Sequence, residues 1–146
     1  LIRPRTLYYG IALAVVSGLM IWGFATRKTL DVHALRDRNP ASVRLHDGAV
    51  RNGYTLKIAN HGFEPVTVEV RYAGVPGAIL RSPGRPASNP LRLGVDPNRV
   101  TSVRVFVTAP AAATEGVDGS RPATFEIRSG DEVETVRTAF EFGEAR

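Results

Sequence analysis

The stretch YTLKIANHGFEPVTVEVRY, residues 54–72, decides the fold of this chain. In residues 54–58 and again in residues 66–72, apolar side chains at even positions alternate with polar side chains at odd positions. Successive side chains of a β-strand point to opposite faces of a sheet, so this period of two predicts two half-buried strands. The turn between them is expected at residues 60–62. The predicted core positions of the two strands are Tyr54, Leu56, Ile58, Val66, Val68 and Val70.

Further short strands are predicted on both sides of this pair, separated by turns rich in Gly and Pro. Asp47-Gly48 is a two-residue hairpin signal between strands expected at residues 42–46 and 49–52. Loops are expected at 74–90, which holds four prolines, and at 109–122. The remaining predicted strands are residues 78–80, 91–95, 100–107, 123–128 and 134–142, with turns at 96–98 and 130–131. Seven or eight such strands without a helical pattern predict an all-β, antiparallel β-sandwich.

A second stretch, TLYYGIALAVVSGLMIWGFAT at residues 6–26, carries no charge. A helix of this length spans ~30 Å, the thickness of the hydrocarbon core of a bilayer. Tyr and Trp side chains lie near its ends and Arg or Lys residues flank it on both sides, as is typical of membrane-spanning helices. A signal peptide and a buried core helix are the alternatives. The apolar run exceeds the roughly 7–15 residues of a signal h-region, so we predict a transmembrane helix.

The predicted organisation has three parts. Residues 1–29 form the transmembrane helix and its flanks, residues 30–41 a juxtamembrane linker, and residues 42–146 the β-sandwich. Within the linker, residues 31–35 are expected to form a short helical turn that ends at Asn39-Pro40, because the residue before a proline is pushed toward extended geometry. The first residue is Leu1 rather than Met, and we expect the chain to be the C-terminal part of a longer protein.

Gly10, Ala14 and Gly18 recur every four residues and therefore share one face of the predicted helix. Small residues let a second helix approach closely in lipid, so other transmembrane helices of the longer protein are expected to pack on this face.

The orientation of the helix in the membrane is predicted from the charges that flank it. Arg27, Lys28, Arg36 and Arg38 outnumber the basic residues before the span, and this count alone favours a cytoplasmic C-terminal part.

Composition excludes several classes of function. The chain has no cysteine, which removes disulfides, thiolate metal sites, cysteine-ligated iron–sulfur clusters and cysteine nucleophiles from it. Its 19 basic residues exceed 14 acidic ones, but the arginines are spread singly along the chain, so nucleic-acid binding is not expected. His33, His46 and His61 have none of the close spacings of metal ligands. We therefore predict no catalytic, cofactor-binding or metal-binding residue and no enzymatic activity in these residues.

Five segments carry a resemblance to a known family. They are LIRPRT (1–6), LRDRNP (35–40), VRLHDG (43–48), RNGYTLKI (51–58) and RVFVTAP (104–110). Together they resemble the C-terminal part of the CcoG/FixG/RdxA family, accessory proteins of cbb-type cytochrome c oxidase. The resemblance runs over nearly the whole chain except the loops at 74–90 and 109–122.

The resemblance implies a multi-span parent in the bacterial inner membrane, with two [4Fe-4S] clusters, a link to copper reduction during oxidase assembly, and a terminal immunoglobulin-like domain. Every cluster-binding cysteine of that pattern is missing here, so no cofactor is carried over to this chain. The resemblance implies a periplasmic C-terminal domain, against the charge count. The expected partners are the lipid bilayer, the parent's other helices, and oxidase subunits or copper-delivery proteins. A copper chaperone and a purely structural cap on the membrane helices are the alternatives.

Overall fold

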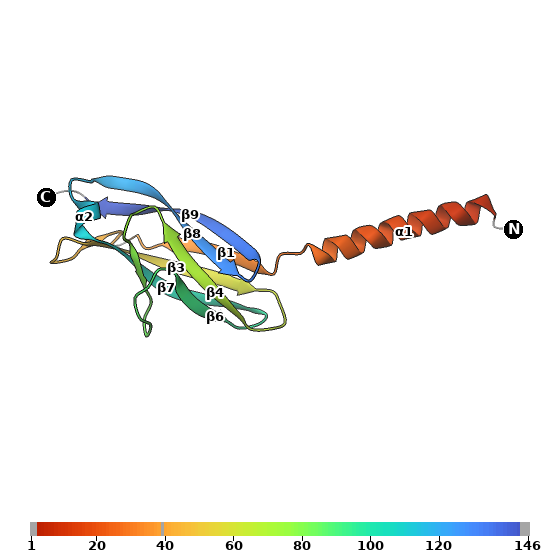
Figure 1. Ribbon diagram of the computed structural model, residues 1–146, viewed down its shortest axis with the longest axis horizontal. Coiled ribbons are helices and arrows are strands. Elements are labelled where there is room, and N and C mark those ends of the chain that lie inside the picture. Colours follow the sequence, from red (N-terminus) through yellow and green to blue (C-terminus); the bar gives the residue numbers. More distant parts are fainter. Residues whose placement is uncertain (1–2, 39, 144–146) are drawn as a thin grey trace.

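The structure, a computed structural model, describes residues 3–38 and 40–143 and consists of a long N-terminal helix joined to a two-layered β-sandwich (Figure 1). Helix α1 (Pro4–Ala25) has 22 residues, and none of them is buried. It is long and apolar enough to cross a membrane. A helix satisfies its own backbone hydrogen bonds, as an apolar segment in lipid requires. The predicted helix is therefore confirmed, and it is not part of the core of the described sandwich.

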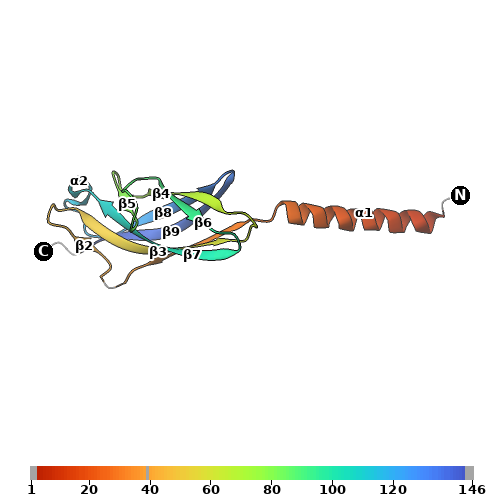
Figure 2. The same cartoon turned by 90° about the horizontal axis from the view of Figure 1, so that it is seen from below.

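The sandwich contains two antiparallel sheets (Figure 2). In the first sheet the strand order is β1-β3-β7-β5, and β2 pairs with the start of β3. Its strands are β1 (Leu30–Arg36), β2 (Val43–Arg44), β3 (Val50–Asn60), β5 (Ile79–Arg81) and β7 (Arg99–Ala109). The second sheet has the order β6-β4-β8-β9. Its strands are β4 (Val66–Ala73), β6 (Leu91–Val95), β8 (Gly119–Ser129) and β9 (Glu132–Gly143). The all-β, antiparallel sandwich is confirmed.

The core lies between the two sheets and is built from the alternating positions of the strands. Leu56 of β3 and Val70 of β4 are fully buried, while Lys57 between the apolar positions of β3 is exposed. Tyr54 packs edge-on against Phe125 of the opposite sheet, with ring centroids 5.1 Å apart. The other fully buried side chains include Ile58, Leu80, Leu93, Ile127, Phe140 and Phe142. The apolar alternation in residues 54–72 therefore marks the core correctly.

The predicted linker at residues 30–41 is wrong in its first half. Residues 30–36 form β1 instead of a helical turn, and β1 pairs with β3 from Leu30 opposite Asn60 to Arg36 opposite Tyr54. Leu30 and Val32 are buried while Asp31 and His33 are exposed, so the alternation of a half-buried strand is present there. The sandwich thus begins only four residues after the helix. Asn39 lies outside the described residues.

Other boundaries differ in detail. The first predicted strand shrinks to β2, and the predicted strands at 49–52 and 54–58 are one strand, β3, that continues through Gly53. The predicted strand at 78–80 is shifted by one residue to become β5, and the 109–122 loop contains α2 (Ala111–Thr114) and the first residues of β8. The hairpin turn at Asp47-Gly48 is confirmed: Leu45 N–H donates to Ala49 O at 2.8 Å, and Gly48 has a positive φ of 82°.

Side chains of β3 join the edge strand β9 of the opposite sheet. The Tyr54 hydroxyl donates to Ala139 O at 2.7 Å. The Asn52 carboxamide, assigned with its nitrogen toward the Glu141 carbonyl, donates to Glu141 O at 2.9 Å and accepts from Glu141 N at 2.6 Å. The Arg36 guanidinium of β1 pairs with the Glu141 carboxylate. Main-chain groups at the edge of β9 are thereby satisfied by side chains instead of another strand.

Candidate interaction surfaces

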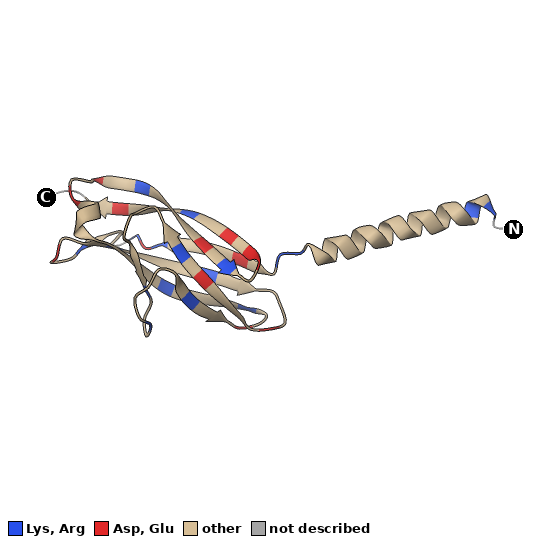
Figure 3. Cartoon of the chain, in the orientation of Figure 1, with Lys and Arg blue, Asp and Glu red and all other residues tan. Residues whose placement is uncertain are grey.

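The junction between helix and sandwich is held by two glutamates at the start of β9. The Glu132 carboxylate accepts hydrogen bonds from the Thr29 hydroxyl at 2.6 Å, from Thr29 N–H at 3.0 Å and from Leu30 N–H at 3.1 Å. Lys28 pairs with Glu134 on the same strand. We call these five residues the junction clasp. In Figure 3 several acidic positions, drawn red on the ribbon, lie in the part of the sandwich nearest the helix.

The electrostatics of the clasp follow from these bonds. Burial by itself raises the pKa of Glu132, but the hydrogen bonds from Thr29 and Leu30 and the charge of Lys28 together lower it below its ordinary value. The hydrogen bond and charge of Glu134 raise the pKa of Lys28. Both groups are thus held in their charged forms at neutral pH. The clasp fixes the position of the chain as it passes from the helix into the sandwich.

The outer face of the first sheet carries a second cluster, which we call the sheet-face patch: Arg51, Arg81, Arg104, Phe106 and Asp37. Phe106 points outward from β7 and is half-buried. The guanidinium carbons of Arg51 and Arg104 lie 5.2 and 5.3 Å from its ring centroid. Arg81 of β5 is the direct cross-strand partner of Phe106. An aromatic ring among guanidinium groups is the composition typical of the energetic centre of a protein interface.

Gly53 and Asp37 shape one border of the patch. Gly53 is the cross-strand partner of Phe106 on the β3 side, and Asp37 lies over it. A Cβ atom on Gly53 would come within 2.5 Å of the Asp37 carboxylate, so any larger residue would displace this side chain from its present position. Asp37 in turn accepts a hydrogen bond from Arg104 at 2.6 Å. The patch therefore holds three arginines against one carboxylate, and it suits an acidic partner.

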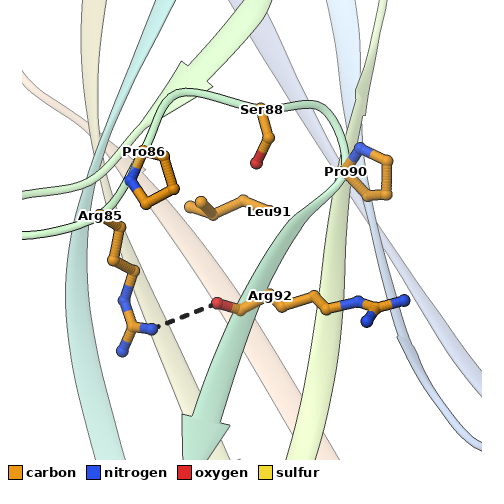
Figure 4. A pocket seen from close by; sticks show the side chains of 6 residues that line it. All are labelled: Arg85, Pro86, Ser88, Pro90, Leu91 and Arg92. Atoms are coloured by element: carbon orange, nitrogen blue, oxygen red, sulfur yellow. Dashed lines mark hydrogen bonds between the residues drawn. The ribbon is translucent and has the colours of Figure 1, made fainter.

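A shallow hollow of about 260 Å³ lies beside the 82–90 loop (Figure 4). Arg85 borders it on one side and donates to Arg92 O at 3.4 Å, while the Arg92 side chain turns away to the Glu69 carboxylate, 2.9 Å from its Nε. The other lining residues are Pro86, Ser88, Pro90 and Leu91. No acid or base lies within hydrogen-bond reach of the Ser88 hydroxyl among the interactions of the described residues, so the hollow lacks the arrangement of a nucleophilic site.

The histidines are not brought together. His33 lies in the middle of β1, with Nε2 3.5 Å from an Asp31 carboxylate oxygen. His61 follows β3 at the end of the sandwich near the helix, and His46 lies in the turn after β2 at the opposite end. Among residues 3–38 and 40–143 no three His, Asp or Glu side chains converge on a point where a metal ion could be held. The expectation that the chain carries no metal site stays a prediction.

Sequence reasoning missed both the clasp and the patch. The clasp joins residues about a hundred positions apart, and a single Glu after a hairpin turn gives no signal of its partner. Phe106 did carry a signal, because it occupies an outward position between the buried Val105 and Val107. A large aromatic residue at a polar position of a strand is the pattern that marks such a surface.

The comparisons with known proteins agree on one family. The family model described as "IG-like fold at C-terminal of FixG" matches residues 20–143. The nitrogen fixation protein FixG of Rhizobium meliloti (strain 1021) is 40% identical over 121 residues, which are 78% of this chain and 23% of that protein. Protein RdxA of Cereibacter sphaeroides is 34% identical over 124 residues, 85% of this chain and 24% of that protein. The chain thus spans about a quarter of the length of these relatives.

A solved structure shares the fold. The crystal structure of a FixG-related protein from Vibrio parahaemolyticus superposes with a TM-score of 0.62 at 18% identity, covering 79% of this chain and 97% of that one. At this level of identity the match supports the fold alone. Together with the family model it confirms the immunoglobulin-like class of the sandwich.

Proposed function

This chain belongs to the family of FixG C-terminal domains with an immunoglobulin-like fold, and we propose that it serves as the membrane-anchored, non-catalytic interaction domain of a FixG-type accessory protein. The observation that carries the proposal is the sheet-face patch. Phe106, Arg51 and Arg104 form an aromatic and basic surface on the outer face of the first sheet, with Arg104 exposed and Phe106 and Arg51 half-buried. Its composition fits recognition of an acidic protein surface.

The larger process that we propose is the assembly of cbb-type cytochrome c oxidase. In this proposal the parent protein transfers electrons through two [4Fe-4S] clusters, takes part in copper reduction, and holds both clusters outside this chain. The absence of cysteine from this chain supports the placement of both clusters elsewhere in the parent, because iron–sulfur clusters are held by cysteine thiolates. The docking partner of the patch is then an oxidase subunit or a copper-delivery protein.

The proposed location is the bacterial inner membrane, with the sandwich on the periplasmic side. Helix α1 is exposed along its whole length, and a Cβ atom on Gly10 or Gly18 would meet nothing within 4 Å. These positions support the proposal that other helices of the parent pack against α1. The clasp then holds the sandwich, and with it the patch, at a set height above the membrane.

Site-specific photocrosslinking in cells tests the proposal. A photoreactive residue at Phe106 of the full-length parent is expected to capture an oxidase subunit or a copper-delivery protein, identified by mass spectrometry. The matched control is Thr67, which is exposed on the outer face of the second sheet. Capture of the same proteins at both positions, or of none at Phe106, would overturn the patch as the docking surface.

The second candidate is a purely structural role as a cap on the membrane helices. The junction clasp favours this role, because the clasp couples the sandwich to the helix. The two roles separate in one experiment. Replacement of Phe106 by Ser together with Arg104 by Glu is expected to lower oxidase assembly while the parent accumulates normally. If assembly stays normal while removal of the whole sandwich depletes the parent, the structural role is correct.

A further inference from the structure

The proposed membrane anchoring by α1, on which this inference rests, would hold one end of the sandwich close to the bilayer surface. Residues 26–29 separate the end of α1 from the start of β1, and four extended residues reach at most about 14 Å. A helix of 22 residues is ~33 Å long, enough to cross the hydrocarbon core, so its last turn lies at the lipid boundary. In Figure 1 the helix leaves from one end of the long axis of the sandwich, and the loops at that end face it.

The loop between β3 and β4, residues 61–65, lies at this end. Leu30 is the cross-strand partner of Asn60, so the loop begins beside the first residue of the sandwich. His61 N–H donates to Thr29 O at 2.8 Å, directly on the linker from the helix. Phe63 at the tip of the loop is 95% exposed. No other part of the described protein buries this ring, whereas the aromatic residues of the core are almost completely buried.

The loop presents Phe63 on a braced backbone. The Asn60 side chain, 1% exposed, donates to Glu64 O at 2.8 Å and accepts from Gly62 N–H at 2.9 Å, so it ties both sides of the loop together. Asn98 N–H of the neighbouring turn donates to Gly62 O at 3.1 Å. An aromatic ring that is displayed on a braced loop loses little conformational entropy on binding.

We propose that the 61–65 loop is a second membrane contact, in which the Phe63 ring inserts between the lipid headgroups of the bilayer that α1 spans. Aromatic rings favour this interfacial region. A single ring binds membranes weakly, but the tether places it permanently at the surface, and the high effective concentration makes a weak contact sufficient. With the helix and the loop both anchored, the sandwich takes one tilt relative to the membrane.

The absence of cysteine allows a direct test on the full chain in vesicles of phosphatidylethanolamine and phosphatidylglycerol. A nitroxide is attached at His61→Cys in the loop or, as a control, at Ala87→Cys on the exposed loop between β5 and β6, which projects from the side of the sandwich away from the helix (Figure 1). We expect the label at 61 to be relaxed by lipid-soluble oxygen and protected from a water-soluble nickel complex. The label at 87 is expected to show the reverse.

Two further variants, each combining His61→Cys with one more substitution, test whether the Phe63 ring is responsible. Phe63→Ser is expected to shift the accessibility at 61 toward that of the label at 87. Ile79→Ser, which removes an exposed apolar side chain of β5 far from the helix, should leave it unchanged. Circular dichroism verifies the fold of each variant. Equal accessibility at 61 and 87, or immersion at 61 that survives Phe63→Ser, would overturn the proposal.

Discussion

The carboxylate of Glu132 receives both the hydroxyl and the main-chain N–H of Thr29, at 2.6 and 3.0 Å. Thr29 is the last residue before the sandwich, and Glu132 is the first residue of β9, directly after the two-residue turn from β8. The chain enters the first sheet after helix α1, and at this point it is held by a side chain of the second sheet. Together with the Lys28–Glu134 ion pair and the hydrogen bond from His61 N–H to Thr29 O, this contact positions the sandwich relative to the helix.

Glu132→Gln is expected to loosen the junction without unfolding the sandwich. An amide keeps the size of the side chain but loses the charge that strengthens its hydrogen bonds. Because the site is partly exposed, we expect a loss of stability of less than about 1 kcal/mol. Hydrogen exchange of the Thr29 and Leu30 amides should become faster, while amides in the middle of β3 stay unchanged. Equal exchange at residues 29 and 30 in both proteins would mean that the clasp contributes nothing.

The clasp is also expected to weaken in acid. The pKa of Glu132 is lower in the folded protein than in the unfolded chain, so its contribution to stability is complete above the ordinary range of a Glu carboxyl, about 4.3. That contribution is lost as the pH falls through the folded pKa. Exchange at Thr29, corrected for its intrinsic pH dependence, should rise below about pH 4. The rise should vanish in Glu132→Gln.

Leu56→Ala should destabilise the sandwich strongly. Leu56 is fully buried, and truncation of a buried Leu costs about 2–5 kcal/mol, a large share of the roughly 5–15 kcal/mol that stabilises a domain. Its neighbour Lys57 is exposed, and Lys57→Ala should cost within about 0.5 kcal/mol. Denaturant titration measures both. Equal unfolding midpoints would contradict the register of β3.

Two buried tyrosines should respond differently to loss of the hydroxyl. The Tyr54 hydroxyl donates to Ala139 O, so Tyr54→Phe should cost about 0.5–1.5 kcal/mol. The buried Tyr72 hydroxyl lies near the Tyr54 hydroxyl but makes no hydrogen bond of acceptable geometry among the described residues, and burial raises its pKa far above the ordinary value. Tyr72→Phe is therefore expected to be neutral or stabilising. Thermal unfolding of the two variants decides this, and a larger loss for Tyr72→Phe would contradict it.

The chain is not expected to bind copper or an iron–sulfur cluster tightly. It has no thiolate ligand, and the structure places His46 and His61 at opposite ends of the sandwich. Calorimetric titration of the detergent-solubilised chain with Cu(I) should show no tight, stoichiometric site. A tight complex that the double substitution His46→Ala and His61→Ala abolishes would contradict this prediction.

The local sequence pattern correctly predicted the strands in which buried and exposed residues alternate. The alternation in residues 54–58 and 66–72 marked the core faces of β3 and β4, and Asp47-Gly48 marked a hairpin, because both signals depend on neighbours in the chain. The same alternation in residues 30–36 was missed. Only Leu30 and Val32 of β1 are buried, and Asp31 and His33 face solvent, so the segment reads as a polar linker.

The amino-acid sequence by itself determined the apolar helix, the sandwich class and the absence of cysteine chemistry, since length, charge and periodicity are properties of contiguous residues. Only the tertiary structure decided which surfaces the domain offers. Strand pairing brings Arg51 and Arg104 over Phe106, Glu132 to Thr29, and the loop that carries Phe63 to the end of the sandwich beside the helix. These residues lie far apart in the chain, and their proximity comes from which strands pair with one another, which the local pattern of a single strand does not specify.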